Sequence, residues 1–176
     1  MWPYVLGFVG LFVAFLLFGL WFGRKFTKQA VAELEKVELA DIPFLCEECV
    51  RTFQEKFGKN LSLDDFEGAS QLLEDAFGRG EAMKRAFARQ DFYYYFVKPV
   101  GAFLGELLRL HTGHQWRKDR PGSPYLVIEQ GENSAECFPF EKVLRTAGAR
   151  PRGELYAYLM AGKEIGKAVA TGHLEP

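Results

Sequence analysis

The sequence has few of the residues that usually mark catalytic or metal-binding sites. Only three cysteines and three histidines occur in 176 residues. No G-x-S-x-G, H-E-x-x-H, Walker or G-x-G-x-x-G pattern is present, so these hydrolase, zinc-protease and nucleotide-binding signatures are excluded. The formal net charge is −1, and such a balanced chain lacks the basic stripe that general nucleic-acid binding requires. We therefore expect no cofactor and no nucleic-acid partner.

Residues 1–23 contain no charged side chain and no His, Asn, Gln, Ser or Thr. As a helix, residues 2–22 would span roughly 31 Å, enough for a bilayer core of about 30 Å. A cleaved signal peptide is the alternative, but no basic residue precedes this segment, and no A-x-A pattern ends it. The segment therefore predicts a single transmembrane helix without its own ion, proton or haem chemistry.

The residues that flank this segment predict its orientation. Lys and Arg beside a span stay on the cytoplasmic side, and Trp and Tyr favour the membrane–water interface. We expect an inner-membrane protein with its N-terminus outside, its C-terminal domain in the cytoplasm and lipid headgroups near the span. The interface residues are Trp2, Tyr4, Trp21, Arg24, Lys25 and Lys28.

One side of the predicted span combines phenylalanine with small residues. Small residues allow close helix packing in lipid, so this face is a candidate docking surface for other transmembrane subunits. The alternative is that these residues simply face lipid. The docking residues are Gly7, Phe8, Gly10, Phe12, Ala14, Phe15, Phe18, Gly19, Phe22 and Gly23.

The rest of the chain has the size of one domain. We expect a juxtamembrane stalk over 24–40, a cytoplasmic α+β domain over 41–170 and a tail over 171–176. Apolar periodicity and turn residues predict helices over 26–37, 41–57, 62–77, 81–96, 97–111, 139–147 and 154–170. Predicted strands cover 115–118, 125–130 and 134–138. The fold class is a transmembrane helix followed by a helical half, a small antiparallel sheet and C-terminal helices. Asp41, and Ser62 or Asp64, are the expected N-caps.

Three short motifs fall within residues 95–160: Gly101-Ala102-Phe103-Leu104-Gly105-Glu106, Gly113-His114-Gln115-Trp116 and Phe138-Pro139-Phe140-Glu141-Lys142-Val143. This stretch resembles a family of uncharacterised bacterial α+β domains with a GAxxGE…GxxW…PFxKV pattern. The resemblance implies an α+β fold and no established activity. Gly101 and Gly105 share one helix face and allow close approach of another element. Glu106 is expected to have a structural role, accepting a hydrogen bond from the backbone or Trp116.

Two cysteine and histidine motifs are weak candidates for metal or redox chemistry. Cys46 and Cys49 form a C-x-x-C, with Cys137 as the remaining cysteine, and His111 and His114 form an H-x-x-H. Both C-x-x-C thiols lie on the apolar stripe of a predicted helix, which favours core packing. A tetrahedral zinc site needs four ligands, so we expect no bound metal.

Basic residues cluster at Arg117, Lys118 and Arg120, and again at Arg145, Arg150 and Arg152. They could meet lipid headgroups or an acidic partner, or form an ordinary solvated surface.

These patterns lead to three hypotheses on function. The first is a non-enzymatic single-pass accessory or scaffold subunit of a larger bacterial membrane complex, of respiratory or photosynthetic type. The second is a membrane-tethered protein-binding or immunity-type module. The third is a thiol- or metal-dependent enzyme that uses the cysteines.

Overall fold

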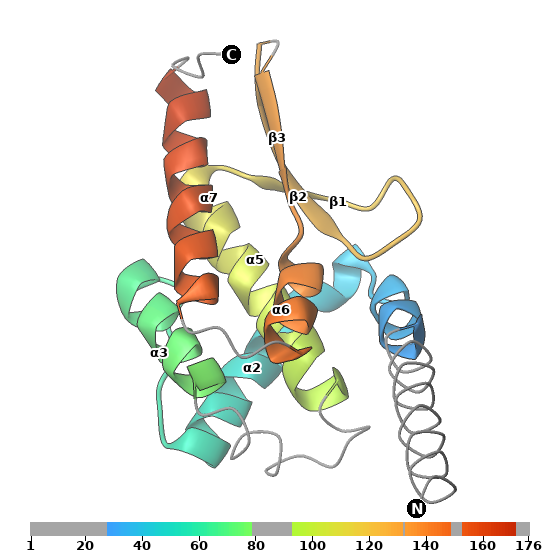
Figure 1. Cartoon of the computed structure of the whole chain (residues 1–176), viewed down its shortest axis with the longest axis vertical. Coiled ribbons are helices and arrows are strands. Elements are labelled where there is room, and N and C mark those ends of the chain that lie inside the picture. Colours follow the sequence, from blue (N-terminus) through green and yellow to red (C-terminus); the bar gives the residue numbers. More distant parts are fainter. Residues whose placement is uncertain (1–27, 79–92, 132, 149–152, 172–176) are drawn as a thin grey trace, which may run out of the picture.

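The computed structural model describes residues 28–78, 93–131, 133–148 and 153–171 (Figure 1). Residues 28–35 form a helical segment ahead of the labelled elements. The helices are η1 (Leu39–Asp41), α2 (Ile42–Phe57), α3 (Phe66–Gly78), the π-helical turn η2 (Tyr93–Val97), α5 (Lys98–Thr112), α6 (Pro139–Gly148) and α7 (Glu154–Thr171). The strands are β1 (Gln115–Arg117), β2 (Tyr125–Gln130) and β3 (Asn133–Cys137). The predicted α+β class, with a helical first half and a small antiparallel sheet, is confirmed.

Helix α5 lies at the centre of the fold, with α2, α6 and α7 packed around it (Figure 1). A helix that is apolar on all sides must be buried on all sides. Accordingly, every residue from Pro99 to Leu108 is buried except Glu106. The helix ends at Gly113, whose φ of 79° is the left-handed conformation that glycine adopts readily.

Glycines on α5 and α7 allow neighbouring elements to approach closely. A Cβ on Gly101 would lie 2.5 Å from the Phe140 ring of α6, and one on Gly105 would lie 2.2 Å from the Trp116 indole of β1. On α7, a Cβ on Gly166 would lie 2.6 Å from Cβ of Thr112 on α5. These distances are too short for any residue larger than glycine unless the neighbour moves. The close approach predicted for Gly101 and Gly105 is therefore present.

The sheet has the order β1-β2-β3, and both strand pairs are antiparallel. Trp116, Leu126 and Cys137 are cross-strand neighbours in register, so their side chains share one face. Leu126 and Cys137 are buried on this face, and α7 packs against β2 and β3. As the last residue of the edge strand β3, Cys137 joins the sheet to α6.

The two predicted helix N-caps agree with the structure in part. Asp41 occupies the N-cap position of α2 as predicted, but its carboxylate makes no capping hydrogen bond to α2. It instead accepts a hydrogen bond from the Glu38 backbone N–H, 2.9 Å away, and closes η1. At α3, Asp65 instead of Ser62 or Asp64 accepts from the backbone N–H of Gly68, at 2.9 Å. Neighbouring acidic residues compete for the same role, and local backbone geometry decides which one takes it.

The prediction of a single-pass membrane fold is contradicted. Among the helices that the structure describes, none combines the length and the hydropathy needed to cross a bilayer. The fold class is therefore corrected to α+β, and the membrane, transmembrane and single-pass descriptions and the inner-membrane localisation are corrected with it. The segment on which they depended, residues 1–23, lies outside the described residues.

The segment predicted as a stalk contributes to the core. Leu34 and Val37 belong to the same buried cluster as α2 and α5, and Ala30 is also buried. The Lys118 ammonium group from the β1–β2 connection holds this segment in place. It donates to the carbonyl oxygens of Glu35 and Val37, at 3.0 Å and 2.6 Å.

Candidate functional site

An open groove with a volume of about 710 Å³ runs along one face of α2. Its lining is mostly apolar and is made by residues spaced three or four apart on α2, which places them on one side of the helix. Leu63, from the α2–α3 connection, and Glu106, from α5, complete it. The residues of the α2 groove are Pro43, Cys46, Glu47, Val50, Arg51, Gln54, Glu55, Asn60, Leu63 and Glu106. The volume is in the range typical of ligand sites, and the open shape suits an extended or helical ligand.

The acidic side chains of the α2 groove outnumber its basic one. Glu47 and Glu55 are exposed, and within the described part of the chain neither makes an ion pair. Among the described residues, Arg51 is the only basic one in the lining, and its guanidinium forms an ion pair with Glu48. The groove lining therefore combines apolar side chains with more acidic than basic groups.

Glu106 is held by four hydrogen bonds at the inner wall of the groove. The Arg109 guanidinium donates three, with distances of 2.6 to 3.0 Å, and the Trp116 indole donates the fourth over 3.0 Å. Burial raises the pKa of Glu106, but the hydrogen bonds from Arg109 and Trp116 outweigh it and leave the pKa below its usual value. The expected Trp116–Glu106 hydrogen bond is thus present. A carboxylate bound in this way is a poor proton acceptor.

The C-x-x-C cysteines lie in and behind the floor of the groove. Cys46 is 6 % exposed and Cys49 is 1 % exposed, and both thiols are free. Burial raises the pKa of Cys46 to about 12, and the nearby Glu106 carboxylate adds to this effect. Burial also raises the pKa of Cys49 well above its ordinary value. Both thiols therefore stay protonated at neutral pH and behave as small apolar side chains.

The structure separates the metal candidates from one another. His111 leaves the α5 surface toward the α2–α3 connection, where its Nε2 lies 2.7 Å from the Leu63 carbonyl oxygen and its ring packs on Phe66. His114 and Cys137 come together, with 3.7 Å between Nε2 and Sγ, and Cys46 and Cys49 lie one turn apart on α2. Across the described residues, no cluster of three or more His, Cys, Asp or Glu side chains has the geometry to hold a metal ion.

His114 and Cys137 are part of a directed chain of hydrogen bonds. The Thr112 hydroxyl donates its single proton to the Leu108 carbonyl oxygen, so it can only accept from Nδ1 of His114. This fixes the imidazole tautomer with the proton on Nδ1 and leaves Nε2 as an acceptor facing the Cys137 thiol. His114 is fully buried, and burial lowers its pKa, so the ring is neutral at pH 7.

Tyr158 of α7 borders the same pair. Its hydroxyl oxygen is buried and, in the described structure, has no hydrogen bond of good geometry. It nevertheless lies near the Cys137 thiol, and burial together with that thiol raises the pKa of Tyr158. Thr112, His114, Cys137 and Tyr158, here named the thiol–imidazole cluster, join α5, β3 and α7.

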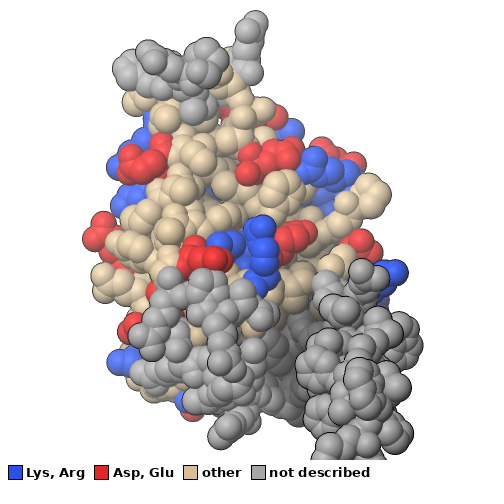
Figure 2. Space-filling view, viewed as in Figure 1, with Lys and Arg blue, Asp and Glu red and all other residues tan. Residues whose placement is uncertain are grey.

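Internal ion pairs occupy much of the predicted basic cluster. Arg117 and Arg120 each pair with a glutamate on the sheet, Glu129 and Glu136 respectively, over 2.7 Å. Lys118 binds backbone carbonyls, as described above. Figure 2 shows basic and acidic side chains interspersed over the described part of one face. Arg145 is exposed, whereas Arg150 and Arg152 lie outside the described residues.

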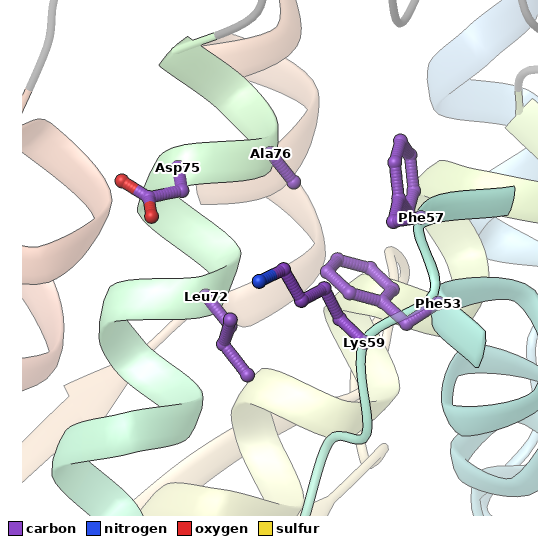
Figure 3. Close-up of a pocket in the computed structure, with 6 residues that line it drawn as sticks. All are labelled: Phe53, Phe57, Lys59, Leu72, Asp75 and Ala76. Carbon is purple, nitrogen blue, oxygen red and sulfur yellow. The ribbon is translucent and has the colours of Figure 1, made fainter.

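A second cleft, between the end of α2 and α3, is too small for a ligand. Its volume is about 10 Å³, room for no more than about one water molecule. Figure 3 shows the Lys59 side chain extending across it beside the Phe53 ring toward Leu72. We assign this cleft no function.

The predicted helix-docking residues, all between 7 and 23, lie outside the described residues, as do the predicted interface residues except Lys28, which is exposed. Of the groove lining, only Cys46 and Glu106 were among the predicted site residues, Cys46 as a weak metal candidate and Glu106 as a structural residue. The cluster partners Thr112 and Tyr158 were not predicted. The combination of apolar and charged residues on one face of α2 is a pattern in the sequence that could have indicated the groove. No local pattern connects Leu63 or Glu106 to that face, or Tyr158 to Cys137.

No family model matches the chain, and no curated protein or solved structure is significantly similar to it. The resemblance over residues 95–160 therefore stays a prediction.

Proposed function

We propose that the protein is a non-enzymatic protein-binding module whose α2 groove takes up a basic amphipathic helix of a partner. The observation that carries this proposal is the groove itself, with an apolar floor formed by Val50, Leu63 and Cys46. A helix of a partner would place apolar residues at i, i+3, i+4 and i+7 on this floor. The module would act as a subunit or adaptor in a larger assembly.

The charge of the groove defines the partner further. Glu47 and Glu55 line the groove beside its apolar residues, and Arg51 is already paired with Glu48. Lysine or arginine residues beside the apolar stripe of the partner would complement these carboxylates and increase the association rate. From Pro43 to Glu55 the groove follows about 18 Å of helix, which suits a partner segment of about 12 residues.

The hydrogen bonding of Glu106 favours binding over catalysis. This carboxylate lines the groove, and its lone pairs are engaged by Arg109 and Trp116. The Cys46 thiol in the floor stays protonated at neutral pH because its pKa is about 12. Neither group is therefore poised as a general base or nucleophile.

Site-specific photo-crosslinking in cells tests this function. A photoreactive phenylalanine analogue replaces Val50 in the floor or, as the control, Glu164 on the exposed side of α7. We expect a defined adduct from position 50 only. Charge reversal by Glu47→Lys with Glu55→Lys should reduce that adduct about tenfold or more, because the basic partner is then repelled.

Two results would count against the proposal. One is that positions 50 and 164 give the same adducts. The other is an adduct at position 50 that does not change when both groove glutamates are reversed. Mass spectrometry of the adduct identifies the partner segment, and a segment without an amphipathic basic pattern would contradict the proposed partner chemistry.

A further inference from the structure

The thiol–imidazole cluster has features that protein binding in the α2 groove does not use. A thiol, a neutral imidazole with a defined tautomer and a tyrosine hydroxyl meet at the junction of α5, β3 and α7. We propose that Cys137 is a site of oxidation by hydrogen peroxide, with His114 as its base and Tyr158 as a donor to the product. This proposal is independent of the proposed function.

The hydrogen-bond direction makes His114 a base for the thiol. Because Nδ1–H donates to Thr112, the lone pair of Nε2 points at the Cys137 sulfur, 3.7 Å away. Burial raises the pKa of the Cys137 thiol, so little thiolate is present at rest and a local base is required for reaction. The imidazole can accept the proton as the sulfur attacks.

The reaction that follows is balanced without further reagents. The Cys137 S–H bond breaks and its proton moves to Nε2 of His114, while the sulfur attacks one oxygen of hydrogen peroxide. The O–O bond breaks, and the departing hydroxide takes the proton from His114 to form water. The sulfur becomes a sulfenic acid, losing two electrons that the peroxide gains. The Tyr158 hydroxyl lies beside the sulfur and can donate to the new oxygen.

Burial selects a small oxidant. Cys137 is only 6 % exposed, at the end of the edge strand β3, so bulky disulfides are excluded, and hydrogen peroxide, which is close to water in size, is the oxidant that we propose. Cys46 is a matched internal comparison because it is also 6 % exposed. Its neighbour is the Glu106 carboxylate, whose charge opposes thiolate formation, whereas Cys137 faces the Nε2 atom of His114.

The test treats the folded full chain with hydrogen peroxide for a set time, removes the peroxide with catalase and then unfolds the chain in the presence of dimedone, which traps sulfenic acids. Peptide mass spectrometry quantifies the labelling of each cysteine. Cys137 should be labelled at least about tenfold faster than Cys46 or Cys49. His114→Gln should slow labelling of Cys137 about tenfold and leave Cys46 unchanged, since the amide cannot take the proton. Circular dichroism confirms that each variant is folded.

Thr112 is a positioning residue, and it provides a variant that retains the imidazole. Thr112→Val should slow Cys137 labelling severalfold by releasing the tautomer, and Thr112→Ser should restore it because the hydroxyl returns. Equal labelling of Cys46 and Cys137 in the native chain would overturn the proposal. So would labelling of Cys137 that is the same in the valine and serine variants, and this comparison decides the matter if His114→Gln does not fold.

Discussion

At the scale of single residues, Gly105, Glu106 and Trp116 depend on one another. The indole of Trp116 occupies the space where a side chain at position 105 would start, and its N–H donates to Glu106 over 3.0 Å. Glu106 is in turn oriented by Arg109. The glycine thus allows a close contact, and that contact orders a carboxylate at the wall of the α2 groove.

We predict that Gly105→Ala lowers the free energy of unfolding by about 1–3 kcal/mol. The added Cβ would lie 2.2 Å from two indole carbons, so the ring must move. In combination with Trp116→Phe, which removes the carbons that clash, the loss should be at least about 1 kcal/mol less than the sum of the single losses. Urea denaturation of the four proteins of this cycle measures the coupling, and purely additive effects would contradict the direct contact.

His114 makes the stability of the fold depend on pH. Burial holds its folded-state pKa below the ordinary value of 6.5. Above pH 6.5 the His114 side chain is neutral in both the folded and the unfolded chain. Its full contribution to the free energy of unfolding is then present. As the pH falls below 6.5, the unfolded chain binds the proton first, so stability decreases until the folded-state pKa is passed.

We therefore expect the free energy of unfolding to fall between pH 7 and pH 5.5, with a slope of up to about 1.4 kcal/mol per pH unit from this one proton. His114→Gln should remove this component of the slope. His111→Gln, at an exposed histidine on the same helix end, serves as the control variant. Denaturant titrations at several pH values measure how the free energy of unfolding changes with pH. The same slope in the native protein and in His114→Gln would contradict the assignment to His114.

At the scale of the elements, helix α7 is capped by a residue from another helix. The Glu74 carboxylate on α3 accepts from the backbone N–H groups of Gly153, Leu155 and Tyr156, the last two at 3.1 Å. These are the N–H groups that the first turn of a helix leaves without partners. The negative charge also interacts favourably with the positive end of the helix dipole.

Glu74→Ala should accordingly lower the free energy of unfolding by about 1–2 kcal/mol, as loss of a helix cap does. Glu67→Ala is the matched control on the same helix, because its side chain is 70 % exposed and forms only a long ion pair with Lys163. It should change stability by less than about 0.5 kcal/mol. Thermal and urea unfolding measure both, and equal losses would contradict the capping role.

At the scale of the whole molecule, the segment before α2 is tied to distant parts of the chain. Glu33 accepts from Tyr94 and Lys98, and hydrogen bonds from Lys36 and Tyr94 lower its pKa to about 2. Lys118 binds the same segment from the other side through two backbone carbonyls. Residues 28–37 are thus integrated into the α+β fold.

Replacement of Lys118 by methionine should release this segment. The methionine keeps the aliphatic stem but leaves two carbonyl oxygens without their donor, at a cost of about 1–3 kcal/mol. Hydrogen exchange should accelerate in residues 28–37 about tenfold or more, with little change in α7. Lys36→Met, at a side chain that is 67 % exposed, serves as control, and equal acceleration there would refute a specific role for Lys118.

The sequence predicts the fold well where local patterns are strong. The apolar positions of α5 and the Tyr125–Gln130 strand indicate the central helix and the middle of the sheet, and both are confirmed. The caps at Asp41 and Asp65 depend on backbone geometry that composition does not encode. The single-pass membrane class was wrong because one apolar segment outweighed the rest of the chain.

The sites were less predictable, because they depend on contacts between distant parts of the chain. The groove needs Leu63 and Glu106 beside α2, and the thiol–imidazole cluster needs Tyr158 beside Cys137. No periodicity or short motif relates these positions. The hydrogen bond from Trp116 to Glu106 was foreseeable, since the two motifs lie close in sequence around one turn.

The glycine contacts around α5 also constrain how this protein can evolve. At the pairs Gly101–Phe140 and Gly166–Thr112, no larger residue can replace the glycine until its neighbour has become smaller or moved. The order of substitution is therefore fixed, with the neighbour changing first. Related sequences should show these pairs varying together, and a lineage that gains alanine at position 101 should already have lost the phenylalanine at position 140.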